Sequence, residues 1–252
     1  MKDRYFSVEV KPTVPASKQN TGAFTAGDVL FDWVEFEIPK GTSRLIGATM
    51  LVRPKGNNTP TGNKFGSFLI FSKTNTVSYG TSNSAQTTIP SNDFLGFIEI
   101  AEEDNFTIGA GTVIGMAGRG SNNSSVEPGL LLTGSQTGSN VGYDKLYVAA
   151  QALGAFDFTS VVAIAEDTDA EHANSQVITT DGTVDESKIF AVGDVLHIGT
   201  TVGTPAADSL IGTVAAVADN LVTLEAVSPT ALVDGDILYN IHPIRLILHF
   251  EK

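Results

Sequence analysis

A seven-residue pattern occurs three times in the chain: FTAGDVL from Phe24, FAVGDVL from Phe190 and LVDGDIL from Leu232. Each copy has an apolar first residue, two variable positions, Gly-Asp, then Val or Ile, and Leu. Gly adopts positive φ without strain and Asp hydrogen-bonds its own backbone, so the Gly-Asp pair favours a turn. The apolar pair that follows favours a strand. We therefore expect a chain built from β-strands, three of which begin after the same turn.

Composition supports an all-β fold with a buried core. The 252 residues are 42% hydrophobic, which is enough for a packed interior. No segment places apolar residues at helical spacing over a dozen positions between capping residues. Cysteine is absent, which excludes disulfides, thiolate catalysis and Cys-bound zinc.

Net charge argues against two classes of partner. At −13, the chain is not expected to bind nucleic acid or an anionic membrane surface, because both attract clustered Lys and Arg. No apolar run approaches the roughly 18 residues of a membrane span. The first ten residues alternate as in a strand and lack the apolar core of a signal peptide.

The acidic residues are concentrated in one segment. Residues 160–241 contain 13 Asp and Glu against a single base, Lys188, for a net charge of −12. The rest of the chain has 15 acids and 14 bases. This step predicts a separate acidic module over 161–241, inserted into a domain formed by 1–160 and 242–252.

Alternating segments predict the strands of the outer domain, with Gly- and Asn-rich connections between them. Eight such segments fit an antiparallel β-sandwich or jelly-roll-like domain. They are Asp28–Ile38, Arg44–Arg53, Ser67–Ser72, Leu95–Ile100, Thr112–Met116, Gly129–Thr133, Lys145–Gln151 and Ile244–Phe250.

Within the insert, residues 190–241 predict a small SH3-like β-barrel of four or five strands. Asp219-Asn220 is expected to turn a hairpin between Gly212–Val217 and Leu221–Val227. The polar stretch Ala165–Glu186 is interpreted as a connecting loop.

Three motifs resemble reactive sites, and each has a simpler interpretation. Glu166–His172 alternates acids, but an EF-hand loop from Asp167 would need Gly in place of His172 and Glu in place of Ile178. We interpret the segment as a solvated loop, and a calcium site of another type stays open as the alternative. Glu102–Asp104 is likewise interpreted as a soluble loop rather than an acid–base pair. Gly109–Gly115 is interpreted as turn glycines beside a strand rather than a dinucleotide fingerprint. We therefore expect no catalytic, cofactor-binding or metal-ligating residues.

Phe31 and Trp33 are the candidate partner-facing residues. They alternate with Glu35 and Glu37 and oppose the face formed by Leu30, Val34, Phe36 and Ile38. Either this face is exposed and covered by a partner, or it is buried beneath a loop of the same chain.

Several phrases, in order, resemble a group of tailed-bacteriophage virion proteins that coat or decorate the capsid. They are FTAGDVLFDWVEFEI, LIGATMLVRPKG, the run from FGSFLIFSK to EEDNF, DKLYVAAQALGAFDFT and IRLILHFEK. The chain departs from this group by carrying the acidic insert before the final strand. The resemblance implies a structural protein without catalytic residues, located in the virion and assembled in the host cytoplasm.

We accordingly expect a non-enzymatic capsid decoration or cement protein. Its partners would be the major capsid protein or other virion proteins, contacted across neighbouring subunits, and the chain would form a homo-oligomer. Two alternatives stay open. One is a tail- or fibre-associated module that binds host-surface carbohydrate, and the other is a glycan-active sandwich enzyme with two carboxylates in a cleft.

Overall fold

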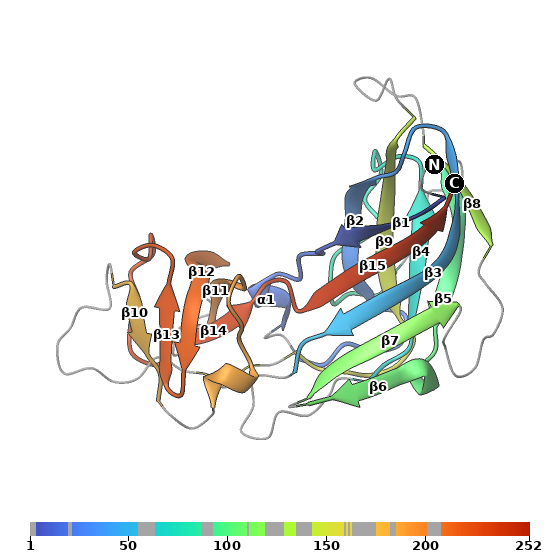
Figure 1. The fold of residues 1–252 in the computed structure, drawn as a ribbon. Helices are drawn as coiled ribbons and strands as arrows, with labels where there is room; N and C mark the ends of the chain where they lie inside the picture. The colour runs from blue at the N-terminus through green and yellow to red at the C-terminus, as the bar shows by residue number, and fades with distance from the viewer. Residues whose placement is uncertain are drawn as a thin grey trace.

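The chain folds into three antiparallel β-sheets, two of which stack as a sandwich while the third lies beside them (Figure 1). The computed structural model describes residues 4–19, 22–54, 64–86, 93–109, 111–118, 129–134, 143–158, 160, 162, 175–181, 185–200 and 208–252. The predicted all-β sandwich is confirmed. The jelly-roll connectivity and the SH3 likeness of the third sheet stay predictions.

The first sheet of the sandwich has six strands in the order β1-β15-β3-β7-β6, with β8 pairing β3. Its central strands alternate buried and less buried residues, as expected where one face packs on a core. The strands are β1 (Tyr5–Val10), β3 (Thr42–Val52), β6 (Asn105–Ile108), β7 (Thr112–Gly118), β8 (Leu130–Thr133) and β15 (Ile244–Glu251).

The second sheet has four strands in the order β2-β9-β4-β5. They are β2 (Val29–Glu37), β4 (Ser67–Ser72), β5 (Phe94–Ile100) and β9 (Lys145–Ala152). Side chains from both sheets form one hydrophobic cluster, in which Phe36 of the second sheet stacks on Phe250 of the first at 6.2 Å between ring centroids. This cluster is the core of the sandwich.

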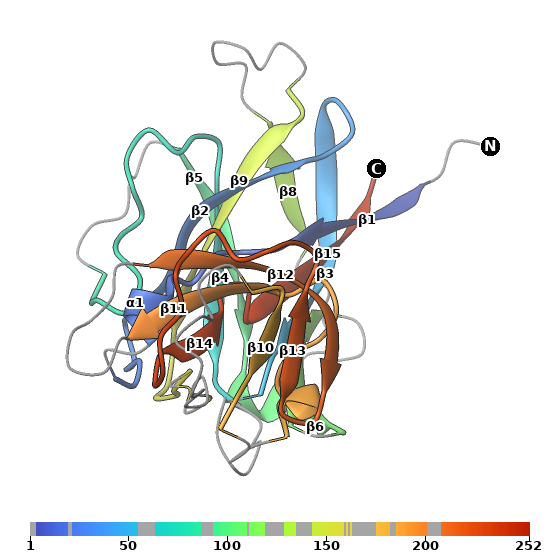
Figure 2. The ribbon, with the colours of Figure 1, turned by 90° about the vertical axis from the view of Figure 1, so that its left-hand side faces the viewer.

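The third sheet, here called the small module, is built entirely from residues between β9 and β15. Its order is β10-β13-β12-β11-β14. The strands are β10 (Val177–Thr179), β11 (Val195–Thr200), β12 (Ser209–Ala218), β13 (Leu221–Leu224) and β14 (Ile237–Asn240). It has a separate hydrophobic cluster, which includes Phe190, Leu196 and Leu238. Figure 2, which views the molecule from this end, shows the module in front of the sandwich.

The three sequence repeats form the same turn. Gly27, Gly193 and Gly235 have φ of +94°, +87° and +79°. In each repeat the Asp N–H donates to the carbonyl three residues earlier, at 3.0–3.1 Å, and the Asp carboxylate accepts from the N–H of that same residue, at 2.7–3.0 Å. The predicted strand-entry turn is confirmed, and it begins β2, β11 and β14.

Most predicted strands lie within a few residues of the observed ones, and the Asp219-Asn220 hairpin joins β12 to β13 with Asp219 at φ +51°. Two predictions need correction. β6 was not foreseen, and the predicted loop Ala165–Glu186 contains β10, which pairs with β13. Within the described residues of this predicted loop, Val177–Thr179 therefore form a strand instead.

The N-terminal segment connects the two units. β1 pairs antiparallel with β15, so that Tyr5 lies opposite Glu251. The chain then runs to α1 (Ala16–Gln19), which contacts β11 and β14 of the small module. Asp208 of the module accepts hydrogen bonds from Ala16 N–H at 2.9 Å and from the Ser17 hydroxyl at 3.2 Å. This segment therefore packs against both units.

Two 3₁₀ turns, η1 (Glu102–Asp104) and η2 (Glu186–Lys188), complete the described elements. Among the described residues, no helix has the length and apolar character to span a membrane.

Candidate functional site

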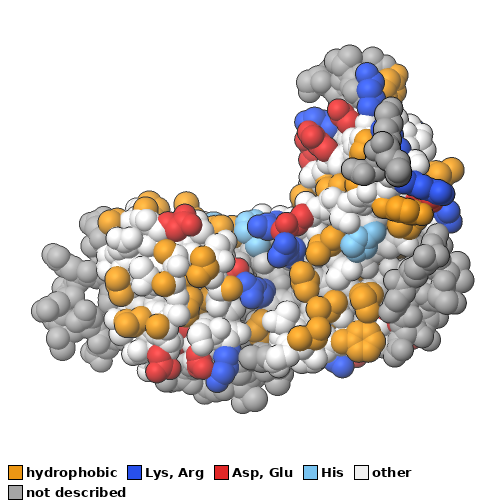
Figure 3. All heavy atoms as spheres, viewed as in Figure 1, with side chains coloured by type: hydrophobic (Ala, Val, Ile, Leu, Met, Phe, Trp, Pro, Cys, Tyr) orange, Lys and Arg blue, Asp and Glu red, His pale blue; other side chains and the backbone are white. Residues whose placement is uncertain are grey.

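The outer face of the six-stranded sheet has an apolar stripe across β6, β7, β3 and β15. Phe106 lies opposite Ile114, Ile114 opposite Leu51, and Met116 opposite Thr49, which in turn lies opposite Ile247. These side chains alternate with core residues such as Met50 and Val113, so they point away from the core. Figure 3 shows hydrophobic side chains gathered at the surface over these strands. We call Leu51, Phe106, Ile114, Met116 and Ile247 the apolar face.

The outer face of the four-stranded sheet is different, because a loop of the same chain covers the part around Trp33, although Phe97 on β5 is 55% exposed. Tyr79, on the loop after β4, is 1% exposed and packs edge-on against Trp33 at 5.2 Å. The Trp33 indole N–H donates to the Val77 carbonyl at 2.9 Å. Asp32 fixes the loop by accepting from the Ser78 hydroxyl and the Tyr79 N–H, both at 2.6 Å. Burial raises the pKa of the Tyr79 hydroxyl to about 12.

Phe31 therefore does not form part of a partner-facing surface. It is 1% exposed and belongs to the core of the sandwich, together with the adjacent Leu30. Two register irregularities in the β2–β9 pairing, between Val29 and Phe31 and between Phe31 and Val34, break the alternation that predicted its exposure. Trp33 is half-buried against the loop. The interpretation of burial beneath a loop therefore holds for Trp33 in part, whereas Phe31 is buried in the sandwich core instead.

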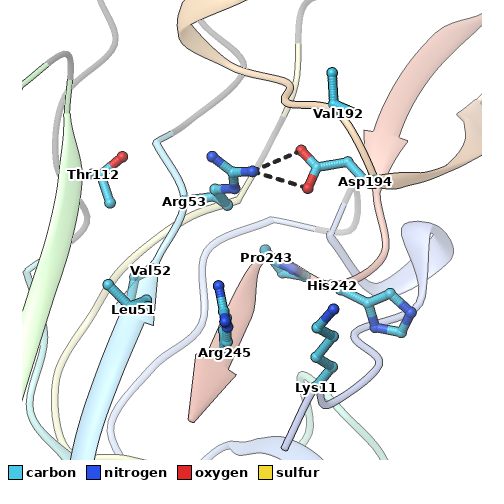
Figure 4. Close-up of a pocket in the computed structure, with 11 residues that line it drawn as sticks. Lys11, Leu51, Val52, Arg53, Thr112, Val192, Asp194, His242, Pro243 and Arg245 are labelled. Carbon is cyan, nitrogen blue, oxygen red and sulfur yellow. Dashed lines mark hydrogen bonds and ion pairs between the residues drawn. The ribbon is translucent and has the colours of Figure 1, made fainter. Parts of the chain in front are cut away.

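A cavity of about 310 Å³ lies where the sandwich meets the small module. Lys11, Arg53 and Arg245 line it from the sandwich side, and Asp194 lines it from the module. Figure 4 shows Lys11 and Arg245 pointing toward the pair formed by Arg53 and Asp194. The remaining walls are mostly apolar: Leu51, Val52, Thr112, Val192, Gly193, His242 and Pro243. We call this cavity the junction cleft.

Three ion pairs, made by two acids, hold the cations of the cleft in place. One terminal nitrogen of Arg53 donates to both Asp194 carboxylate oxygens, at 2.9 and 3.2 Å. Glu9 of β1 pairs with Arg245 Nε at 2.6 Å and with Lys11 Nζ at 3.5 Å. Asp194 is the aspartate of the second repeat, so the turn that begins β11 also anchors the module to the sandwich.

Backbone contacts also connect the two sides of the cleft. The Val14 N–H donates to the Ile241 carbonyl, and the Arg53 N–H donates to the Pro243 carbonyl, both at 2.8 Å. His242 Nδ1 lies 3.0 Å from the Pro12 carbonyl. The cleft is therefore preformed.

Two buried acids in the small module lack a cation among the described residues. Glu186 is fully buried, and one of its oxygens accepts from the Thr180 hydroxyl while the other has no partner there. Asp236, the aspartate of the third repeat, is 1% exposed and has one such oxygen as well. Burial raises the pKa of both carboxyls above its ordinary value. These acids destabilise the module when they are ionised.

The motifs singled out in the sequence do not form a reaction centre among the described residues. Asp104 is buried, so the interpretation of Glu102–Asp104 as a solvated loop is wrong for this residue, although Glu102 and Glu103 are exposed. Gly109 and Gly111 have positive φ just before β7, as expected for turn glycines. The 166–172 segment lies outside the described residues. In the described ranges, no three His, Asp or Glu side chains gather as metal ligands would.

Sequence reasoning missed both the apolar face and the junction cleft. The basic residues of the cleft come from positions 11, 53 and 245, and only the β1–β15–β3 pairing brings them together. The alternation of β3 and β15 was the one signal of the apolar face.

Comparison of the chain with protein-family models, with curated proteins and with solved structures finds no match.

Proposed function

We propose that this chain is a non-enzymatic structural protein of a virus particle, which adheres to the capsid shell through its apolar face. The small module is directed away from the shell. The observation that carries the proposal is the apolar stripe that runs across four paired strands of the six-stranded sheet, whereas a loop of the same chain covers part of the outer face of the other sheet.

The chemistry of the apolar face suits adhesion to a protein surface. Phe106 is 37% exposed, and Ile108 beside it is 55% exposed. A contiguous apolar surface framed by polar residues is typical of a protein-binding site. Ordered strands carry these side chains, so little conformational entropy is lost on binding.

The resemblance to tailed-bacteriophage virion proteins supplies the partner. The phrases that carry it correspond to β2, β3, β4, β5, β9 and β15, all of which lie in the sandwich. The occupant of the apolar face is accordingly the major capsid protein or another virion protein, contacted by many copies of this chain at once. Repetition over a symmetric shell makes modest contacts sufficient.

Charge supports the orientation of the small module. The acids of residues 160–241 give that segment a net charge of −12, whereas the rest of the chain is near neutral. A strongly acidic unit on the outside keeps particles soluble and mutually repulsive. The near-neutral sandwich avoids that repulsion where it meets the shell.

A binding assay with particles tests this proposal. Ile114→Asp places a charge at the centre of the apolar face, where the residue is only half-buried and is not part of the core cluster. Wild-type protein should co-sediment with virus particles purified from the native host, and Ile114→Asp should lose at least about tenfold in affinity, because the new carboxylate would be desolvated without a partner.

Val227→Asp is the matched control, since Val227 is a 50% exposed valine of the small module. It should bind as the wild type does. Equal binding by Ile114→Asp and the wild type would show that the apolar face is not the surface that contacts the shell. Failure of the wild type to bind any part of the particle would refute the proposed function as a whole.

A further inference from the structure

The junction cleft concentrates basic residues in an acidic chain. Three of the 15 Lys and Arg residues, Lys11, Arg53 and Arg245, line one cavity of about 310 Å³ in a chain whose net charge is −13. Ion pairs within the fold account for only part of this charge. Glu9 and Asp194 supply two negative charges against three positive ones. One positive charge is therefore left without a counter-charge in the described surroundings of the cleft.

Donor groups are also left over. Within the described part of the chain, Arg245 uses its Nε for Glu9, and Arg53 uses one terminal nitrogen for Asp194. A guanidinium has five N–H donors in a planar fork, and this fork matches the two oxygens of a carboxylate or phosphate. The side chain of Arg245 is 49% exposed and that of Lys11 is 58% exposed, so water reaches both groups.

Charge and size together select the ligand. A single excess positive charge balances a monoanion, whereas a phosphate near its second pKa would bring up to two negative charges beside Glu9 and Asp194. A volume of about 310 Å³ is at the lower end of small-molecule pockets. Leu51, Val192 and Pro243 provide apolar walls for a carbon skeleton, and the Thr112 hydroxyl provides a polar contact.

We infer that the junction cleft binds an organic monocarboxylate the size of one acidic sugar. Its carboxylate accepts hydrogen bonds from the terminal nitrogens of Arg245 and from Lys11 Nζ, beside Glu9, and its ring lies against the apolar walls. This site is separate in chemistry from the apolar face, although Leu51 borders both, and it does not depend on docking to a shell.

Titration of the full-length chain tests the inference, with glucuronate as the probe and calorimetry or NMR shifts as the readout. Glucuronate should bind with one-to-one stoichiometry. Glucose, a neutral sugar of similar size, should bind at least about tenfold more weakly, because it lacks the charge-assisted hydrogen bonds. Arg245→Gln and Lys11→Gln should each weaken glucuronate binding by about fivefold or more. Arg53 is left unchanged because it anchors the module.

Arg44→Gln is the matched control. Arg44 is also an arginine on the six-stranded sheet paired with a glutamate, Glu251 at 3.4 Å, but it lies at the opposite end of β3 from the cleft. This variant should bind glucuronate as the wild type does.

Three results would overturn the inference: no binding of glucuronate, binding that survives both Arg245→Gln and Lys11→Gln, or inorganic phosphate binding as tightly as glucuronate. The last result would make the cleft a general anion site. Particle binding by Arg245→Gln is measured in parallel. Because Arg245 is not part of the apolar face, this variant should lose glucuronate binding and still bind particles, which separates this inference from the proposed function.

Discussion

The sandwich and the small module begin strands with the same Gly-Asp turn, yet they are stabilised to very different degrees. Within the described ranges, the core cluster of the sandwich contains 29 residues, eight of them phenylalanine, whereas that of the module contains 12 residues with Phe190 as its one aromatic. Since apolar burial is the main stabilising term in folding, the module has much the smaller reserve of stability. Identical local geometry therefore does not imply equal local stability.

The three turn aspartates show how the surroundings change the role of one motif. Asp28 also accepts the hydrogen bond of the Thr25 hydroxyl. Asp194 pairs with Arg53 across the junction. Asp236 has no cation among the described residues, and burial raises its pKa. The same turn motif therefore has three roles: a local cap at Asp28, an anchor between the two units at Asp194 and a source of instability at Asp236.

Truncation of a core leucine is the largest expected effect. Leu238→Ala in the module and Leu248→Ala in the sandwich each remove a fully buried side chain and should cost about 2–5 kcal/mol. Because the module has the smaller core, Leu238→Ala should unfold β10–β14 while the sandwich keeps its protection. Amide hydrogen exchange resolves the two units. Loosening of both units to the same extent would show a single cooperative core.

Replacing the turn glycines tests whether the turn itself is equivalent in both units. A Cβ at Gly193 meets nothing within 4 Å, and a Cβ at Gly27 meets only Gln151 Nε2 at 3.8 Å, so the cost of alanine is conformational. Gly27→Ala and Gly193→Ala should each cost about 1–2 kcal/mol in the free energy of unfolding.

Gly193→Asn should cost less than Gly193→Ala, since Asn tolerates positive φ. Denaturant titration of the three variants gives the comparison. A cost confined to one of the two units would show that the shared turn does not have a shared energetic role.

The effect of pH on the free energy of unfolding should also differ between the module and the sandwich, by less than the effects of the substitutions above. The raised pKa of Glu186 and Asp236 means that the folded module holds these two protons more tightly than the unfolded chain does. Their contribution to stability is complete below the ordinary carboxyl pKa and is lost as pH rises through the raised values. The module should therefore weaken as pH rises above about 4.

Glu186→Gln should flatten this dependence, because the amide oxygen can still accept from the Thr180 hydroxyl without becoming charged. Glu225→Gln, at an exposed position of the same module, is the control and should leave the dependence as it is. Urea unfolding at a series of pH values measures the effect. A module that grows more stable between mildly acidic and neutral pH would contradict the assignment.

Much of the fold follows from short-range patterns. Alternation identified most strands of the sandwich, and the Gly-Asp turn marked the start of β2, β11 and β14. These features depend on the local preference of each residue and its neighbours, which a sequence displays directly. The step in charge likewise marked the segment that contains the whole five-stranded sheet.

The parts that failed depend on contacts between distant segments. Phe31 is buried because bulges in β2 let two consecutive residues enter one core, which strict alternation does not allow. Asp104 is buried in a 3₁₀ turn that the acidic run did not suggest. The junction cleft needs Lys11, Arg53 and Arg245 to meet across three strands, and no local pattern encodes that meeting.

An electron-microscopy reconstruction of native virus particles, with this chain located in the density, tests the central claim most directly. The account predicts many symmetric copies on the head, with β3, β6 and β7 against the shell and the small module facing solvent. Copies confined to the tail, particles without the chain, or density in which the small module contacts the shell would contradict it.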